Sequence, residues 1–123
     1  MSDYRDSDRS SIRVLFCIGV RDAFFDAAAP ERAALVTATR EAFADLTGRF
    51  GLRVLGTMDD DEVMVGPSTG FPWTAYILAD VPDYATVAAV CSIIRDQGVG
   101  DVQLWKYYTI EARLGRGLFF GNE

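Results

Sequence analysis

Histidine is absent from the 123 residues of this chain, and this absence is the most informative feature of the composition. It excludes nucleophiles activated by a histidine base, haem ligated by histidine, and zinc or iron sites that contain histidine. Any proton transfer must therefore use carboxylates, tyrosine, lysine, cysteine or groups of the substrate itself.

Cysteine is scarce and long apolar runs are missing. The two cysteines, Cys17 and Cys91, form neither a disulfide framework nor a CxxC pair, and we interpret them as buried thiols of a cytoplasmic protein. No apolar run approaches the roughly 18 residues of a transmembrane span. The polar segment 1–10 is not typical of a signal peptide and is predicted to be a disordered lead-in, before a single domain over residues 11–123.

Basic residues are outnumbered, with 12 Lys and Arg against 18 Asp and Glu, which gives a net charge of −6. Proteins that bind nucleic acid or anionic membranes rely on clustered cations, so neither partner is expected. Half of the residues are apolar, which is a globular composition sufficient for one hydrophobic core.

The apolar pattern predicts four strands and two helices in the order βαββαβ. The first helix is expected to begin at Pro30 and to be capped at Gly48, and the second to begin at Pro82 and Asp83 and to end at Gly98. The predicted strands cover residues 11–20, 52–58, 73–80 and 101–115. With right-handed crossovers, this order gives an α+β, ferredoxin-like fold in which two helices cover one face of a four-stranded antiparallel sheet.

The helix-free face of that sheet is predicted to carry aromatic side chains. Strict alternation along 101–115 places Trp105 and Tyr107 on one face and Tyr108 on the other. Such a face is usually buried, and a second copy of the chain is its commonest cover. We therefore expect a homodimer in the form of a dimeric α+β barrel.

Several other classes of protein share the βαββαβ order, and each has its own sequence requirements. RNA-recognition motifs need basic residues with aromatics on the first and third strands, and heavy-metal domains need a CxxC motif after the first strand; the chain has neither. An amino-acid-binding regulatory domain of the ACT type remains an open alternative.

Four consecutive acids, Asp59, Asp60, Asp61 and Glu62, follow the second predicted strand. Their spacing differs from that of a calcium loop, so we interpret them mainly as a solvated turn. If one of them acts chemically, it is Asp59 or Asp61, which share a face if the strand continues through them.

The connection that follows is much longer than the roughly two to five residues of a hairpin loop, and is predicted to cover a pocket or to pad a dimer edge.

Four segments carry a resemblance to a known family. They are "RVLFCIGV", "GTMDDDEVMVGPS", "PWTAYILAD" and "LWKYYTIEARLGR". In this order, over residues 12 to 116, the chain resembles the IacB-like small proteins of bacterial indole-3-acetic acid catabolic clusters, which also occur near natural-product genes. The resemblance implies a dimeric α+β barrel and a role in modifying an indole or another aromatic metabolite. It identifies no catalytic residues.

The candidate site residues are ionisable or aromatic side chains near the third and fourth strands. The candidates for catalysis are Asp59, Asp61, Tyr108 and Glu111. The candidates for substrate binding are Trp73, Tyr76, Trp105 and Tyr107, with Arg113 or Arg116 as the anchor for a substrate carboxylate. A structural interpretation competes, in which the aromatics belong to the core and Glu111 pairs with Arg113. No metal and no cofactor is predicted.

Two functional hypotheses result. The first is a small cofactor-independent enzyme that acts on an aromatic metabolite, of the indole or natural-product type, in a pocket between sheet and helices. Tyrosine and carboxylate groups would catalyse isomerisation, cyclisation, ring hydrolysis or oxygenation of an activated substrate. The second is a non-catalytic binding or accessory protein that delivers a reactive intermediate to a partner oxygenase.

Overall fold

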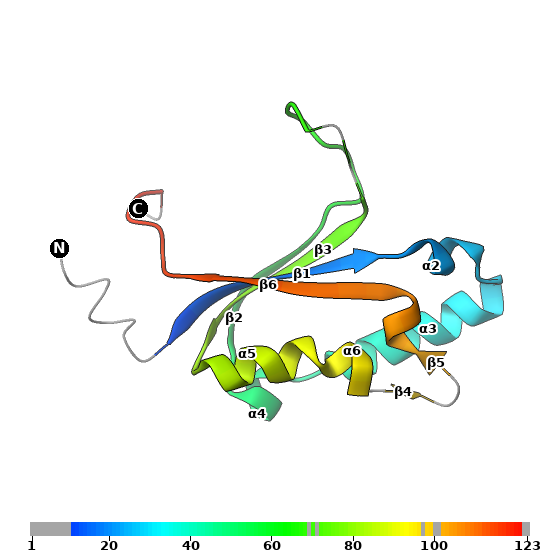
Figure 1. Cartoon of the computed structure of the whole chain (residues 1–123), viewed down its shortest axis with the longest axis horizontal. Coiled ribbons are helices and arrows are strands. Elements are labelled where there is room, and N and C mark those ends of the chain that lie inside the picture. Colours follow the sequence, from blue (N-terminus) through cyan, green and yellow to red (C-terminus); the bar gives the residue numbers. More distant parts are fainter. Residues whose placement is uncertain (1–10, 69, 71, 97, 100–101, 122–123) are drawn as a thin grey trace.

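The computed structural model describes residues 11–68, 70, 72–96, 98–99 and 102–121, so the predicted lead-in 1–10 lies outside the described residues. Its main sheet has four antiparallel strands in the order β2-β3-β1-β6. The strands are β1 (Ile12–Val20), β2 (Arg53–Asp59), β3 (Thr74–Val81) and β6 (Tyr108–Gly115). The helices lie on one face of this sheet (Figure 1). The predicted ferredoxin-like α+β fold is confirmed.

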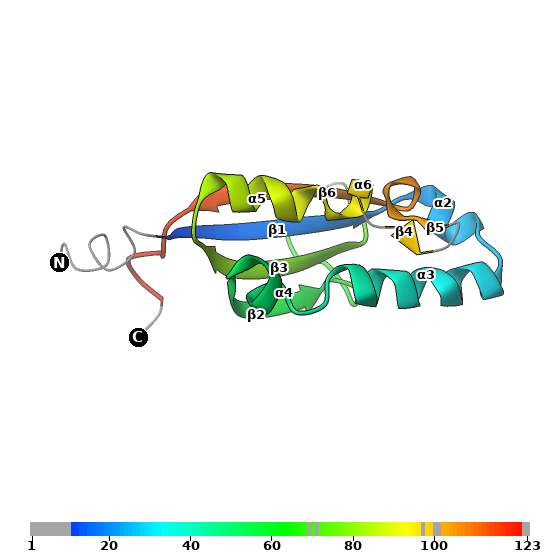
Figure 2. The same cartoon turned by 90° about the horizontal axis from the view of Figure 1, so that it is seen from below.

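The helical layer is divided between the two sides of the sheet. Helices α3 and α4 lie on the β2 side, whereas α5 and α6 lie on the β6 side (Figure 2). The bounds are α2 (Asp22–Asp26), α3 (Ala29–Ala42), α4 (Leu46–Phe50), α5 (Tyr84–Cys91) and α6 (Ile93–Asp96). Among the described residues, no helix has the length and apolar character to cross a membrane.

The core lies between β1 and the helices. Strand β1 is central in the sheet, as predicted, and its side chains Val14, Phe16 and Ile18 point into the core with at most 8% exposure. Period-two alternation places Leu15 and Cys17 on the opposite face, where they are half-buried. The helices and remaining strands complete the core with Leu35, Ala38, Ala42, Ala79, Val81, Val87, Val90, Ile94 and Leu104.

The first helix ends earlier than predicted, and Gly48 is not its cap. Helix α3 stops at Ala42, and Asp45, in the left-handed region at φ 49°, caps the separate helix α4. The Gly48 N–H donates to the Asp45 carboxylate at 3.0 Å, and a Cβ on Gly48 would overlap that carboxylate. A side chain at position 48 would thus displace the capping carboxylate of Asp45, while Gly51, at φ 73°, ends α4.

The second helical segment begins as predicted. The Asp83 carboxylate accepts hydrogen bonds from the Thr86 N–H at 2.8 Å and the Thr86 hydroxyl at 2.6 Å, and these bonds lower the pKa of Asp83. The segment divides at Ser92 into α5 and α6 and ends at Asp96. Gly98 does not end it, because this residue already lies in the short strand β4 (Gly98–Val99).

The fourth predicted strand is interrupted. Strand β5 (Val102–Gln103), which pairs with β4, is followed by the 3₁₀ turn η1 (Leu104–Lys106), and β6 begins only at Tyr108. The buried Leu104 accepts a hydrogen bond from the Tyr107 N–H at 3.0 Å, which closes this turn. The alternation predicted from residue 103 onward is therefore wrong before Tyr108, because a turn rotates the side chains out of the strand pattern.

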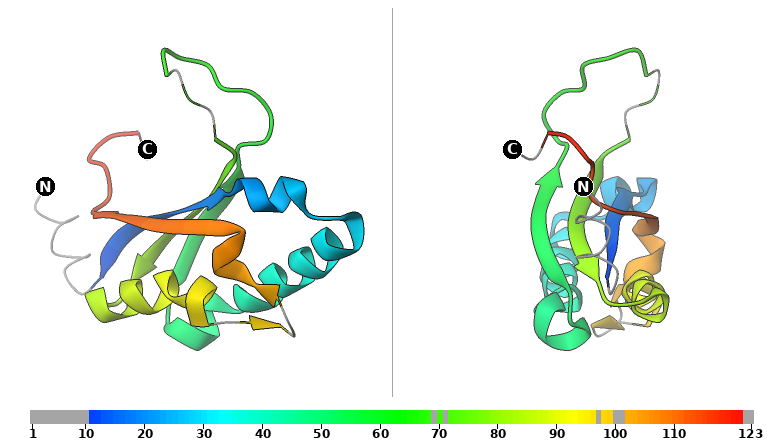
Figure 3. Two further views of the ribbon diagram at one scale, coloured as in Figure 1. Left: turned by 45° about the vertical axis from the view of Figure 1, so that its right-hand side comes forward. Right: turned by 90° about the vertical axis from the view of Figure 1, so that its left-hand side faces the viewer.

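We call the helix-free side of the sheet the open face. Of the aromatic residues predicted to be functional, only Tyr76 projects from a strand of this face, next to Leu15, Met58 and Leu78, with which it forms an apolar groove of about 390 Å³. Trp105 and Tyr107 are absent from it because η1 replaces the strand there. The long connection between β2 and β3 and the segment after β6 both rise on this side (Figures 1 and 3).

Candidate functional site

A cavity of about 690 Å³ lies between helix α3 and the edge strand β2. Small-molecule sites commonly have volumes of roughly 300–1,000 Å³. Every residue of β2 is exposed, including Val54, which faces the helices yet remains 40% exposed. The helix layer therefore does not close over the edge strand, and the space left uncovered is the cavity.

One face of α3 forms the helical wall of the cavity. Its side chains recur at helical spacing: Val36, Thr39, Arg40 and Phe43. A neighbouring face, with Leu35, Ala38 and Ala42, is buried in the core. Burial of Leu35, Ala38 and Ala42 fixes the orientation of the helix, so that Val36, Thr39, Arg40 and Phe43 face the cavity. This wall is half apolar, through Val36 and Phe43, and half polar, through Thr39 and Arg40.

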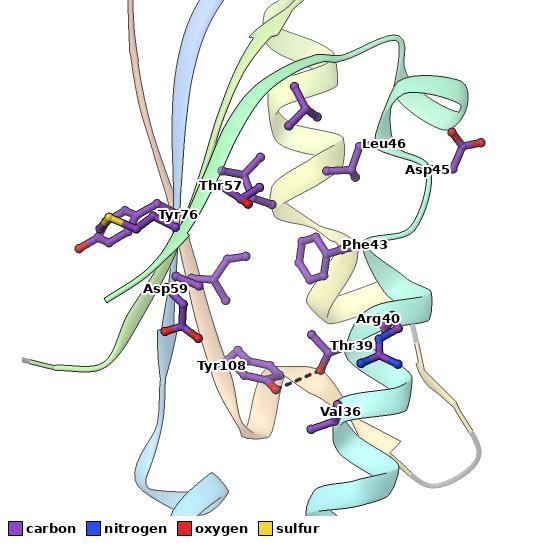
Figure 4. Close-up of a pocket in the computed structure, with 15 residues that line it drawn as sticks. Val36, Thr39, Arg40, Phe43, Asp45, Leu46, Thr57, Asp59, Tyr76 and Tyr108 are labelled. Atoms are coloured by element: carbon purple, nitrogen blue, oxygen red, sulfur yellow. Dashed lines mark hydrogen bonds between the residues drawn. The ribbon is translucent and has the colours of Figure 1, made fainter. Parts of the chain in front are cut away.

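Tyr108 projects from the first position of β6 into the cavity and contacts Thr39. The Thr39 hydroxyl oxygen lies 2.7 Å from the Leu35 carbonyl oxygen and 3.0 Å from the Tyr108 hydroxyl (Figure 4). The Thr39 hydroxyl has one hydrogen to share between these two oxygens, and where it donates to Tyr108 the phenol keeps its own hydrogen for a ligand. Burial raises the pKa of Tyr108, and the bond with Thr39 opposes this effect. The phenol is therefore neutral at neutral pH and is suited to donate a hydrogen bond or proton.

Asp59, the last residue of β2, supplies a carboxylate to the opposite wall of the cavity (Figure 4). Its Oδ1 accepts a hydrogen bond from Trp73 Nε1. The Trp73 ring packs edge-to-face against Phe24 at 5.7 Å between centroids, and Phe24 lies 6.3 Å from Tyr108. The side chains of Asp59 and Tyr108 are thus connected through the packed rings of Trp73 and Phe24.

Asp60 holds the base of the long β2–β3 connection closed. Its N–H donates to the Thr74 carbonyl at 3.1 Å, and its Oδ1 accepts from the Thr74 N–H at 2.7 Å. Its Oδ2 accepts from the Tyr76 hydroxyl at 3.1 Å. The pKa of Tyr76 is raised above its ordinary value. Burial is the largest cause, and the hydrogen bond to Asp60 and the negative charge of Asp60 add to it. Asp60 is therefore a structural residue that joins the two ends of the connection.

The structure separates the predicted catalytic residues into different places. Asp59 and Tyr108 line the main cavity. Asp61 does not share a face with Asp59, because β2 ends at Asp59; it lies instead at a smaller depression beside Phe25 and Trp73. Glu111 projects from the open face of β6 and is paired with Arg113 at 3.4 Å, both mostly exposed, as the structural interpretation predicted.

The predicted binding residues are likewise dispersed. Tyr76 lies at the border between the main cavity and the groove of the open face and lines both, and its hydroxyl is held by Asp60. Trp105 is 47% exposed on η1, and Tyr107 contributes to a separate depression beside the first half of α3. Arg116 is exposed beyond the end of β6.

Sequence reasoning missed Thr39, Arg40 and the pair Phe24–Phe25 as site residues. Thr39 lies at helical spacing among apolar residues, and one polar residue in such a stripe is a usable signal. The phenylalanines lie in α2, a five-residue helix that is too short to produce a helical pattern. Within the described residues, no group of three His, Cys, Asp or Glu side chains is placed to hold a metal ion.

Comparison with known proteins gives one distant structural likeness. No protein-family model matches the chain, and no curated protein matches it. A dimeric protein of unknown function and ferredoxin-like fold from Bacteroides fragilis is similar over 85% of this chain and 95% of its own, at 11% identity and a TM-score of 0.39. A similarity of this size does not bear on function.

The role of Asp60 leads to a prediction with a neighbouring control. Asp60→Ala should speed amide hydrogen exchange at Thr74, because the amide loses its acceptor, and should destabilise the protein by about 1–2 kcal/mol. It should also bring the pKa of Tyr76 closer to its ordinary value, because Asp60 is the source of two of the effects that raise it. Exchange mass spectrometry and an NMR titration measure the two effects.

Asp61→Ala is the matched control for that measurement. Asp61 is exposed and makes no hydrogen bond or ion pair within the described part of the chain, so its removal should leave the exchange at Thr74 unchanged. Equal effects of the two substitutions would contradict the structural role of Asp60.

Proposed function

We propose that this protein is a small enzyme that binds an aromatic metabolite in the α3–β2 cavity and catalyses proton transfer on it. The observation that carries the proposal is the presence of Tyr108 and Asp59 in one largely apolar cavity of about 690 Å³. The apolar walls suit a flat ring, and the two polar groups suit acid–base chemistry.

The two groups differ in what they do with a proton. Tyr108, whose pKa is raised by burial, donates to a substrate oxygen or nitrogen on which negative charge develops. Asp59 is an exposed carboxylate with its Oδ2 available beside the Trp73 bond, and it accepts a proton from the substrate. This division supports an isomerisation or cyclisation that needs no cofactor.

The setting of the reaction is supported by the sequence resemblance. The segments shared with the IacB-like proteins include "GTMDDDEVMVGPS", which contains Asp59, and "LWKYYTIEARLGR", which contains Tyr108. The resemblance favours a metabolite of the indole or natural-product type. Both proposed catalytic residues therefore lie in segments that carry it.

One observation favours the second candidate, a non-catalytic binding or accessory protein that supplies a partner oxygenase. Asp59 and Tyr108 each already have a partner within the protein, Trp73 and Thr39 respectively. Both side chains would then shape a binding cavity without reacting. Recovery of an unchanged ligand, with no product formed by the purified protein, separates this candidate from the enzyme.

We further propose that the protein is a homodimer that buries the open face. The groove formed by Leu15, Met58, Tyr76 and Leu78 lies uncovered on this face, and Leu78 is 36% exposed at its centre. Exposed apolar side chains also occur on the segments that rise at both ends of this face: Val63, Val65, Leu118, Phe119 and Phe120. A second copy related by a two-fold axis would cover both groups of side chains.

The catalytic proposal predicts a specific pattern of variants. Tyr108→Phe and Asp59→Asn should each lower turnover of an aromatic substrate by about 100-fold or more, because each removes one proton-transfer group. Glu111→Gln should leave turnover unchanged, because Glu111 lies on the open face. Chromatography with mass detection of an indole and phenol library measures turnover.

Normal turnover in both cavity variants would contradict the assignment of the site. Loss of turnover in Glu111→Gln alone would move the chemistry to the open face. Product formation by none of the library compounds, together with retention of an unchanged ligand, would favour the accessory protein.

The dimer proposal predicts that a charge at the centre of the open face prevents association. Leu78→Arg should convert the dimer to a monomer in analytical ultracentrifugation, because burial of an unpaired guanidinium is unfavourable. Ala89→Arg, on the exposed side of α5, is the matched control and should remain dimeric. A monomeric wild-type protein would disprove the proposal.

A further inference from the structure

Arg40 is a cation of the cavity wall to which the preceding sections assign no role. Among the described residues that line the cavity it is the only lysine or arginine. Its guanidinium makes no hydrogen bond or ion pair with any part of the chain that the structure describes. Figure 4 shows Arg40 on the helical wall, beside Thr39 and Tyr108 and across the cavity from Asp59.

No hydrogen bond to the end of α3 occupies the Arg40 side chain within the described part of the chain. Arg40 lies in the last turn, where a cation stabilises the helix dipole. The carbonyl that such a residue would bind is already occupied, because Arg49 Nη1 donates to the Ala42 and Ala44 carbonyl oxygens at 2.7 Å each. Arg40 is thus left with its donors directed to solvent or to a ligand.

The two carboxylates of the cavity are committed to other partners. Asp45 accepts the Gly48 N–H at 3.0 Å, and Asp59 accepts Trp73 Nε1. Neither lies within ion-pair distance of Arg40. A ligand anion would be repelled by Asp45 and Asp59 and attracted by Arg40, so it would bind nearest to Arg40.

We propose that Arg40 is the anion anchor of this cavity and that it restricts the ligands to flat aromatic acids. This inference rests on the proposed function of the same cavity and names its substrate class. A guanidinium binds a carboxylate through two parallel hydrogen bonds, which fixes the orientation of the ligand as well as its charge. The ring then lies against Phe43 and Tyr108, and a ligand N–H or O–H points to Asp59.

This assignment replaces the anchors predicted from the sequence. Arg113 projects from the open face and is paired with Glu111 at 3.4 Å. Arg116 follows β6 outside the lining of the cavity and has a partner within the protein. Neither residue is placed to hold a carboxylate in the α3–β2 cavity.

A matched pair of probes tests the inference. The probes are 2-naphthylacetate and 2-naphthylacetamide, which share a ring system and differ in charge, and their affinities are measured by calorimetry. The wild-type protein should bind the acid about tenfold more tightly than the amide, and added salt should reduce this preference. Arg40→Gln should abolish the preference, by weakening binding of the acid much more than binding of the amide, and Arg40→Lys should retain part of it.

Arg32→Gln is the matched control, because Arg32 is an exposed arginine of the same helix outside the cavity lining. It should keep the full preference for the acid. Equal affinities of wild type for acid and amide, or a preference that survives in Arg40→Gln but is lost in Arg113→Gln, would overturn the anchor and leave the proposed function standing. Failure of wild type to bind either probe would overturn both.

Discussion

The packing of helix α3 against the centre of the sheet is the constraint on which the rest of the structure depends. Leu35, Ala38 and Ala42 bury one face of the helix in the core, and this contact leaves the edge strand β2 without a helical cover. The uncovered space is the cavity of about 690 Å³. A helix face that would otherwise bury β2 therefore lines the cavity that we propose as the binding site, with Thr39 and Arg40 as polar members.

The aromatic contacts around Trp73 connect this cavity to the long β2–β3 connection. Trp73 packs on Phe24 and Phe25 of α2 and donates to Asp59 at the end of β2. The next acid, Asp60, joins the two ends of the connection. Two adjacent carboxylates thus serve different parts of the molecule, one at the cavity wall and one at the base of the connection.

The fold was predictable from the sequence, whereas most of the site was not. The segment 11–20 is too uniformly apolar for an exposed edge, which predicts that β1 is central, and Asp83 marks the start of a helix; both signals are local. Alternation failed before Tyr108 because the turn η1 interrupts the strand, and a tertiary contact with buried Leu104 favours that turn. The separate roles of Asp59 and Asp60 depend on where β2 ends. The cavity itself arises from the distance between two elements, which no local pattern encodes.

The proposed ligand site of this protein is the α3–β2 cavity. The most direct test is an NMR titration of the ¹⁵N-labelled protein with 2-naphthylacetate, with the amide shifts followed along the chain. If the ligand binds in this cavity, saturable changes in amide chemical shift are expected mainly at Thr39 to Phe43 and at Thr57 to Asp59, where the two walls face each other. Shifts confined to Leu15, Tyr76 and Leu78 on the open face would contradict it.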